Sequence, residues 1–479
     1  MADASQRSAV MFRTLNLIRA SRLARQAQLM SRADLLKLQE QRWRAMARHA
    51  LEVSPFYRRH LKGIDVERCQ LTDIPPITKE LMLENWDEIV ADPRLRRAAL
   101  DAYLKEPKNW NRLHHGRWMV STTAGTSAVV TPTVHDVNAV DWIYATANVR
   151  HSASPRSSAD AAEEPSSPGL RRRLKVIAFV TDASPAISAI MYRTRPRIGA
   201  LFSRYHAISI TAPWPEILAQ VQRIQPDAMM GYASLLGRLA KAQLSGELNI
   251  RMPQGRGYLS AGGDATTPGI RDLCRRAFGI EPFSTYGCGE TLGIARQWSG
   301  MQHMLCHDDL LAFEAVDAQG QPVPEGVLSD HALATPLMNK ALPLLRYRIN
   351  DRVKLGPVDS EWPFRRIEQL IGRSSMNYTF KTPEIRAFTG MLFLFKMDER
   401  DDVAAYQFRQ TAPDAVEALV VPSPGVDEAR LVRGMEEQMR HSLDQAGCNA
   451  VKVSARVVPQ ILPDPRTGKV EQNVPLPEE

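Results

Sequence analysis

The stretch YLSAGGDATTPGIRDLCRRAF, residues 258–278, decides the fold class. A short apolar strand at Tyr258–Ser260 runs into the glycine pair Gly262 and Gly263, and a helix is expected at Pro268–Phe278. Strands separated by helices of this length are typical of βαβ units and a mostly parallel sheet. The same alternation is expected earlier in the chain, at 175–180 (strand), 214–224 (helix), 229–231 (strand) and 235–244 (helix). Because ligands of such sheets bind at the carboxyl ends of the strands, the glycine turns should lie at a binding site.

From Leu310 onward the pattern changes. Strands are expected at 310–316 and 326–333, and the polar string RYRINDRVKL follows at 346–355. Past Arg373, a segment of about a hundred residues is typical of a small α+β domain, with strands at 416–421 and 451–458 around a helix at 428–446. The sequence therefore predicts an α/β protein with a basic N-terminal helical arm (1–50), a large domain of mostly parallel sheets flanked by helices (51–373) and a small C-terminal domain (374–479).

Composition and charge narrow the class of protein. The chain has 479 residues, 44% of them hydrophobic and 24% charged, which is typical of a globular protein of more than one domain. No apolar run approaches the ~20 residues of a membrane span, and no signal peptide is recognisable, so a cytoplasmic location is expected. Residues 1–62 hold thirteen Lys and Arg against four acids, and the rest of the chain is about neutral within a net charge of +8. Basic residues are not interleaved with aromatic ones, so no nucleic-acid partner is expected.

The basic arm itself permits two interpretations. Its arginines recur among apolar residues at a spacing that suits an amphipathic helix. Such a helix could contact a membrane surface or an acidic partner, although a basic arm more commonly packs its apolar side on its own chain. A mitochondrial presequence would have a similar pattern. The apolar side predicted from the spacing comprises Val10, Phe12, Leu15, Ile18 and Leu23.

Four short segments carry residues suited to chemistry on a nucleotide. Residues 120–136, VSTTAGTSAVVTPTVHD, form a hydroxyl-rich loop of small residues that phosphate oxygens could approach. In YGCGE, Tyr286 could stack on a base and Glu290 could hold Mg²⁺, although a core aromatic and a surface charge are the commoner explanations. Asp351, in YRIND, could accept ribose hydroxyls. Lys469, in PDPRTGK, is by itself only a basic residue in an exposed turn.

The order and spacing of these segments carry more information than any one of them. From about Ser54 to Val474 the sequence resembles the adenylate-forming superfamily of acyl-CoA synthetases and ligases, in particular its phenylacetate–CoA ligase and CapK-like branch. The segments that carry the resemblance are SPFYRRHL (54–61), LTDIPPITKE (71–80), GYASLLGRLA (231–240), SAGGD (260–264), YGCGE (286–290), PLLRYRINDRV (343–353), IGRSS (371–375) and PRTGK (465–469), together with the hydroxyl-rich loop.

The resemblance implies ATP-dependent activation of a carboxylic acid to an acyl-AMP with release of pyrophosphate, then transfer of the acyl group. It implies Lys469 as the catalytic residue, Glu290 as the Mg²⁺ ligand, and a hinge at Ser374 and Ser375 that makes the small domain mobile. The nucleotide-binding residues that it implies are Gly125, Thr126, Ser127, Gly262, Gly263, Asp264, Tyr286, Gly287, Asp351 and Arg373. Candidates for a pocket that holds a small aromatic or hydrophobic acid are Tyr205, His206, Met229, Met230, Gly231, Tyr232 and Ala233.

The sequence leaves the acyl acceptor open. Coenzyme A is the leading expectation, an amine or a carrier-protein thiol is the alternative, and a homodimer is possible. The chain also departs from the family pattern: Ala128 replaces a loop glycine, Gly289 replaces a threonine, and Ser374 and Ser375 stand where an acidic hinge residue is expected. These departures would also suit a non-catalytic nucleotide-binding homologue that acts as a biosynthetic partner, whereas Asp351 and Lys469 favour an enzyme.

Overall fold

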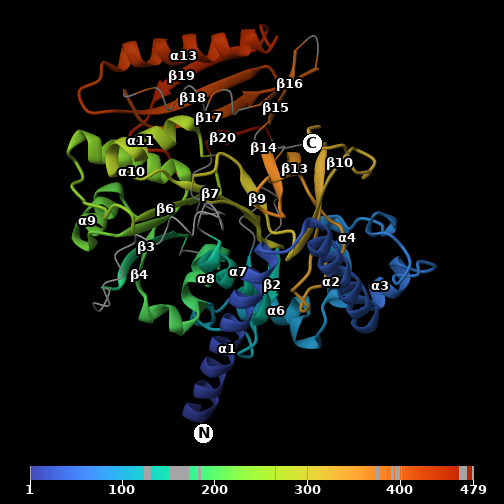
Figure 1. Ribbon diagram of the computed structural model, residues 1–479. Helices are drawn as coiled ribbons and strands as arrows, with labels where there is room; N and C mark the ends of the chain where they lie inside the picture. The colour runs from blue at the N-terminus through green and yellow to red at the C-terminus, as the bar shows by residue number, and fades with distance from the viewer. Residues whose placement is uncertain are drawn as a thin grey trace. The chain divides into compact units, whose positions relative to one another are not determined.

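The computed structural model describes residues 2–122, 131–150, 172–181, 185–264, 266–298, 300–373, 377–382, 385–389, 402–462 and 472–476, together with Phe393, Met397 and Arg400. The chain divides into two compact units (Figure 1). Unit 1 comprises Met1–Leu174, Pro185–Tyr205 and Phe283–Leu370. Unit 2 comprises Lys175–Ser184, His206–Pro282 and Ile371–Glu479. The predicted boundary between residues 373 and 374 stays a prediction.

Unit 1 begins with helices whose starts are encoded locally. The hydroxyl of Ser31 accepts a hydrogen bond from the Asp34 amide, and that of Ser54 accepts one from the Tyr57 amide, so each serine caps the first turn of a helix. The helices of unit 1 are α1 (Ala2–Gln28), α2 (Arg32–Val53), α3 (Pro55–His60), α4 (Lys79–Glu84), α5 (Trp86–Ile89), α6 (Arg97–Leu104), α7 (Val137–Val149) and α8 (Ile187–Thr194).

Helix α1 buries a different side from the one that its apolar spacing indicates. Phe12, Leu15 and Ile18 are exposed, whereas Leu17 and two alanines are buried against Trp142 and Ala145 of α7, and a third alanine is buried beside Trp298 in a separate cluster. The alanines lie at a spacing of three or four residues, and their small side chains let the two helices approach closely. The buried alanines are Ala20, Ala24 and Ala27.

The strands of unit 1 form three sheets. The antiparallel pair β1–β2 is one sheet, the order β10–β11–β12 gives a second, and the third contains β13–β14–β9–β8–β7 in that order. The pairs β7–β8, β8–β9 and β9–β14 are antiparallel, so this sheet is mixed. The strand expected at 326–333 instead runs from His331 to Pro336, because Gly326, at φ +78°, lies in a turn. The bounds are β1 (Trp118–Thr122), β2 (Pro132–Asp136), β7 (Phe283–Cys288), β8 (Leu292–Gln297), β9 (Met304–Cys306), β10 (Leu311–Val316), β11 (His331–Pro336), β12 (Tyr347–Ile349), β13 (Asp351–Val358) and β14 (Arg365–Arg373).

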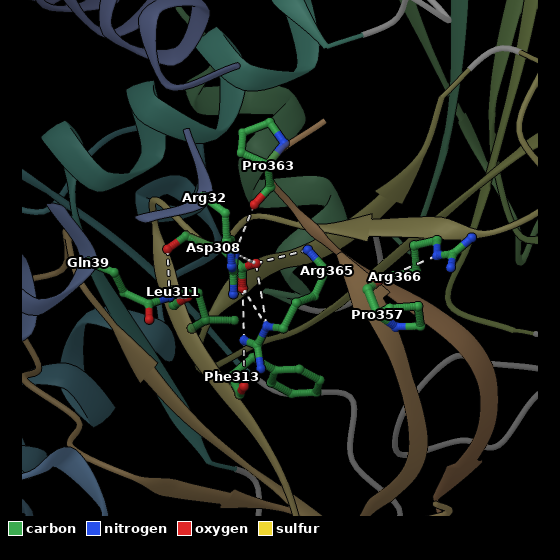
Figure 2. Close-up of polar contacts among 9 residues, drawn as sticks. All are labelled: Arg32, Gln39, Asp308, Leu311, Phe313, Pro357, Pro363, Arg365 and Arg366. Carbon is green, nitrogen blue, oxygen red and sulfur yellow. Dashed lines mark hydrogen bonds and ion pairs between the residues drawn. The ribbon is translucent and has the colours of Figure 1, made fainter. Parts of the chain in front are cut away.

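A buried carboxylate ties the N-terminal helices to this unit (Figure 2). The guanidinium groups of Arg32 and Arg365 both point at Asp308, with N–O distances of 2.6 and 2.8 Å. Burial alone would raise the pKa of Asp308, but the two arginines outweigh it and lower the pKa to about 2. The basic residue Arg32 is therefore committed to the chain's own fold.

Unit 2 contains the predicted parallel strands. β3 (Leu174–Val180) pairs in parallel with β5 (Ala228–Gly231), and β5 pairs in parallel with β6 (Tyr258–Gly262). Helices α9 (Trp214–Ile224) and α11 (Pro268–Phe278) match the predicted bounds. The remaining elements around these strands are β4 (Ser203–Ser209) and α10 (Ala233–Ser245).

The C-terminal part of unit 2 is a second, smaller sheet. Its order is β19–β18–β17–β20, with α13 buried against it through Leu431, Met435 and Met439. The predicted α/β class with a small C-terminal α+β part is confirmed. The bounds are β15 (Asn377–Lys381), β16 (Ile385–Thr389), β17 (Val403–Ala412), β18 (Ala415–Pro422), α13 (Glu428–Gln445), β19 (Lys452–Val457) and β20 (Asn473–Val474). Across the described ranges, no helix combines the length and hydropathy that crossing a bilayer requires.

Candidate active site

Two carboxylates expected at a nucleotide site lie in unit 1, each held by a tyrosine from the other motif. The Tyr286 hydroxyl donates to Asp351 Oδ2 at 2.7 Å, and the Tyr347 hydroxyl donates to Glu290 Oε1 at 3.0 Å. All four residues are nearly buried. The YGCGE and YRIND segments are therefore cross-linked in both directions, so the two carboxylates are positioned together. These two segments, with His135, are called the turn region below.

The local backbone explains the shape of the YGCGE turn. A Cβ on Gly287 would lie 1.8 Å from the carbonyl oxygen of Leu292, so no larger residue fits there. The register of β7 with β8 shifts beside Gly287, and Leu292 itself has a φ of +65°. This bulge directs the turn that carries Glu290.

His135, on β2, supports that turn from the other side. Its Nε2 lies 2.7 Å from the Gly289 carbonyl oxygen, and its Nδ1 lies 3.3 Å from Asn339 Nδ2. Burial lowers the pKa of His135 to about 4, although the bond to Gly289 acts in the opposite direction. The ring is therefore neutral near pH 7, and the contacts assign its proton to Nε2, since the Asn339 amide can only donate to Nδ1.

The site residues that were expected at the carboxyl ends of the parallel strands lie in unit 2. Because β5 and β6 are parallel and Gly231 is paired with Ala261, the carboxyl ends of the two strands are adjacent. A Cβ on Gly263 would lie 2.7 Å from the ring of Tyr232, so this ring lies directly over the glycine, whose φ is +84°. Residues 230–232 and 262–264 are called the strand-end region below.

Asp264 has a structural task in this region. Its Oδ1 accepts from the Ala233 amide at 2.5 Å and its Oδ2 accepts from the Ser234 amide at 3.0 Å. Both amides belong to the first turn of α10, where backbone N–H groups lack intrahelical partners and a negative charge is favoured. Asp264 thus caps α10, and a place in an adenine pocket stays a prediction for it.

The remaining predicted residues divide between the units or lie outside the described residues. Tyr205 belongs to unit 1, where its carbonyl accepts from the Tyr192 hydroxyl, whereas His206 belongs to unit 2. Met229 and Ala233 are fully buried, Met230 is exposed, and Arg373 ends β14. The residues that lie outside the described ones are Gly125, Thr126, Ser127, Ala128, Ser374, Ser375 and Lys469.

The phosphate-loop candidate nevertheless has described neighbours. It connects Thr122, the last residue of β1, to Thr131, just before β2, and Thr122 pairs with Pro132 in the antiparallel ladder. Ser121 and Thr133 share a 2.7 Å hydrogen bond across these strands. His135 lies three residues after Pro132 on β2, so one short strand links the loop to the turn that carries Glu290.

Sequence reasoning missed His135, Asn339 and the role of Tyr347. The available signal was a histidine within the otherwise apolar and hydroxyl-bearing strand PTVHD, directly after the loop. A buried histidine needs hydrogen-bond partners, but its partners lie 154 and 204 residues away in the chain, so spacing could not identify them.

The described side chains fit a magnesium ion that is delivered with a nucleotide. Among them, no group of three or more His, Cys, Asp or Glu could hold a metal ion alone. Mg²⁺ is commonly held by one or two carboxylates together with substrate phosphates. The Glu290 carboxylate accepts a hydrogen bond from Tyr347 at Oε1, and its role as a magnesium ligand stays a prediction.

No model of a known protein family matches the chain, and no curated protein matches it in sequence. Solved structures do match. For 2-hydroxyisobutyryl-CoA ligase in the postadenylation state with R3-HIB-AMP, the TM-score is 0.65 at 18% identity, over 94% of this chain and 91% of that chain. This chain has the fold of an adenylate-forming CoA ligase. The same ligase with 2-HIB-AMP gives a TM-score of 0.64 at 19% identity, over 90% and 87% of the two chains. The same ligase in the thioesterification state, with 2-HIB-AMP and CoA, gives a TM-score of 0.56 at 17% identity, over 94% of this chain and 91% of that chain.

Proposed function

We propose that this protein is an ATP-dependent ligase that converts a small carboxylic acid to an acyl-AMP and transfers the acyl group to coenzyme A. The observation that carries the proposal is the crossed pair of tyrosine–carboxylate bonds, which position Glu290 and Asp351 together. This arrangement lies in a chain that shares its fold with a CoA ligase over nearly its whole length. The phenylacetate–CoA ligase branch and a cytoplasmic location are parts of this proposal.

Each residue has a task that its chemistry suits. Asp351 would accept the two ribose hydroxyls, Glu290 would bind Mg²⁺, and Gly125–Ser127 would bind the β- and γ-phosphates. Bound Mg²⁺ would supply positive charge against the phosphates. Lys469 would bridge the attacking carboxylate and the α-phosphate, since a compact ammonium can lie between two acceptors. The nucleophile is already an anion, so no general base is required.

The small domain would move between the two half-reactions. Lys469 must enter the site for adenylation and withdraw so that a thiol can reach the acyl carbon, and Ser374 and Ser375 would provide the hinge. Within unit 2, Lys241 of α10 donates to the carbonyls of Arg400 and Val403, at 2.7 and 3.1 Å. A rotation would have to release or carry along this contact.

The acid would be aromatic or otherwise hydrophobic. Tyr232, with its ring over Gly263, together with Met230 and Gly231 would form part of its pocket, and Tyr205 and His206 are further candidates. An amine or a carrier-protein thiol is the alternative acceptor. In a non-catalytic homologue, the nucleotide would bind without turnover, and Gly289 in place of a threonine favours that second candidate.

One experiment separates these functions. Exchange of labelled pyrophosphate into ATP is measured across a panel of aryl and alkyl acids, with Lys469→Ala as the control. Loss of the coenzyme A thiol is then followed with the best acid. Acid-dependent exchange with thiol loss supports the proposal, and exchange without thiol loss indicates another acceptor. ATP binding without exchange for any acid would establish the non-catalytic function instead.

A further inference from the structure

Helix α1 presents an exposed face that is apolar in one half and cationic in the other. Met11, Phe12, Leu15 and Ile18 are each about 60% exposed, from 59% to 62%. At 100° per residue these four lie on one side of the helix, opposite the buried alanines. The same side continues into three exposed arginines, Arg19, Arg22 and Arg25.

Two further exposed apolar residues lie on a neighbouring segment of the same unit. Leu201 and Phe202 are 63% and 71% exposed, at the end of the 3₁₀ helix Arg197–Leu201. Ile198 of that segment packs in the same cluster as Leu17, Ala20 and Ala24 of α1. Just before this segment, the carbonyl of Thr194 at the end of α8 accepts a 2.6 Å hydrogen bond from Arg13 Nη1 of α1.

Both segments are strongly cationic. Asp3 is the one acidic residue of α1, and residues 4–33 and 185–205 contain ten arginines and no Asp or Glu. Arg13 is neutralised by Asp141 of α7, at 2.5 Å, and Arg32 by Asp308. Arg19, Arg22 and Arg25 form no ion pair with any residue that the structure describes. The exposed residues Met11, Phe12, Leu15 and Ile18, with Arg19, Arg22 and Arg25, all on one side of α1, are called the cationic apolar face.

We infer that the cationic apolar face docks on an anionic lipid surface. Its apolar side chains would enter the boundary between head groups and acyl chains, and its arginines would contact the lipid phosphates. Because the apolar and cationic residues follow one another along one side of α1, the helix would lie in the plane of the interface. The protein would bind the membrane peripherally.

The charge argues against a second copy of this chain as the occupant. A symmetric dimer centred on the apolar half would leave the arginines of both copies without a partner. Anionic head groups would instead supply counter-charge to the arginines while the acyl boundary takes up the apolar side chains.

The test is flotation of the full-length protein with vesicles of phosphatidylcholine alone or mixed with phosphatidylglycerol. We expect binding to the mixed vesicles that weakens as salt is raised, and little binding to phosphatidylcholine alone. The triple variant Arg19→Gln, Arg22→Gln, Arg25→Gln and the double variant Phe12→Ser, Leu15→Ser should each partition at least about tenfold more weakly.

A matched control removes three exposed arginines from unit 2, as Arg223→Gln, Arg251→Gln and Arg433→Gln. It should bind like the unsubstituted protein, and all variants should retain pyrophosphate exchange because the cationic apolar face lies outside the proposed site. Equal loss in the control triple, or no binding of the unsubstituted protein to mixed vesicles, overturns the inference. Self-association that the double variant abolishes, without lipid binding, would assign the face to a second copy and also overturn it.

Discussion

The turn region and the strand-end region carry candidate site residues in different ways. In the turn region, side chains hold side chains or the turn backbone: the Tyr286–Asp351, Tyr347–Glu290 and His135–Gly289 bonds join residues 65, 57 and 154 positions apart. In the strand-end region, steric contact and hydrogen bonds to the backbone determine the local structure. Gly263 lies under the Tyr232 ring, and Asp264 caps α10. A lost hydroxyl or carboxylate in the turn region should therefore weaken nucleotide or Mg²⁺ binding as well as stability, whereas an added methyl in the strand-end region should act through stability.

The largest effect is expected from a residue in neither region. Lys469→Ala should slow acid-dependent pyrophosphate exchange at least about a hundredfold, because a charge at a developing oxyanion is worth on the order of 3 kcal/mol. Lys452→Ala on β19 is the control, since Lys452 pairs with Asp414 on the surface. A rate above a tenth of the normal one would remove Lys469 from the reaction.

The two aspartates should separate the regions. Asp351→Ala should weaken ATP binding about a hundredfold in calorimetry, since hydrogen bonds to charged groups are worth about 1.5–3 kcal/mol each. Its free energy of unfolding should also fall, by about 1–3 kcal/mol, because the buried Tyr286 hydroxyl loses its acceptor. Asp264→Ala should lower the free energy of unfolding by about 1 kcal/mol through loss of the helix cap. An unchanged ATP dissociation constant in Asp351→Ala would exclude the ribose contact.

A glycine pair isolates the packing effect. Gly263 and Gly246 both have a φ of +84°, but only Gly263 has a ring above it. Gly246→Ala should cost about 1 kcal/mol for the backbone alone. Gly263→Ala should cost about 1–3 kcal/mol more, because Tyr232 must shift. Urea unfolding of both variants measures the difference, and equal midpoints would show that the Tyr232 ring yields freely.

His135 should make the stability of the turn region depend on pH. Its pKa in the folded protein, about 4, lies below the ordinary value of 6.5. The unfolded chain therefore binds a proton first as pH falls, and stability present above pH ~6.5 is lost between there and about 4. Near pH 5 the loss should be about 2 kcal/mol relative to neutral pH. His135→Gln should unfold with a correspondingly smaller pH dependence, and an unchanged dependence would assign the titration elsewhere.

The smallest effect is expected from Tyr347→Phe. It removes one hydrogen bond to the Glu290 carboxylate, worth about 1.5 kcal/mol, so the Mg²⁺ concentration for half-maximal exchange should rise about tenfold. Tyr144→Phe is the control, since its buried hydroxyl bonds the Met191 carbonyl away from the turn region. If both variants respond equally to Mg²⁺, Tyr347 does not position the carboxylate.

Local signals predicted much of unit 2. The bounds of α9 and α11 were predicted correctly because the apolar residues repeat at helical spacing, and because Gly279 in a left-handed conformation ends α11. The long strand β17 was not predicted, because apolar and polar residues alternate only weakly in its sequence, VAAYQFRQTA. Pairing with β18 stabilises it as a strand. The buried alanines of α1 were not predicted, because alanines make a weak hydrophobic signal and a good helix contact.

The sequence by itself determined the α/β class, the order of the motifs and the identity of the residues able to serve a nucleotide. Only the tertiary structure decided which of them meet. Helix periodicity and glycine turns act over a few residues and can be recognised in the chain, whereas the bonds of Tyr286, Tyr347 and His135 depend on strands brought together from distant segments. The same reason applies to α1: its two faces differ only because α7 covers one of them and leaves the other exposed.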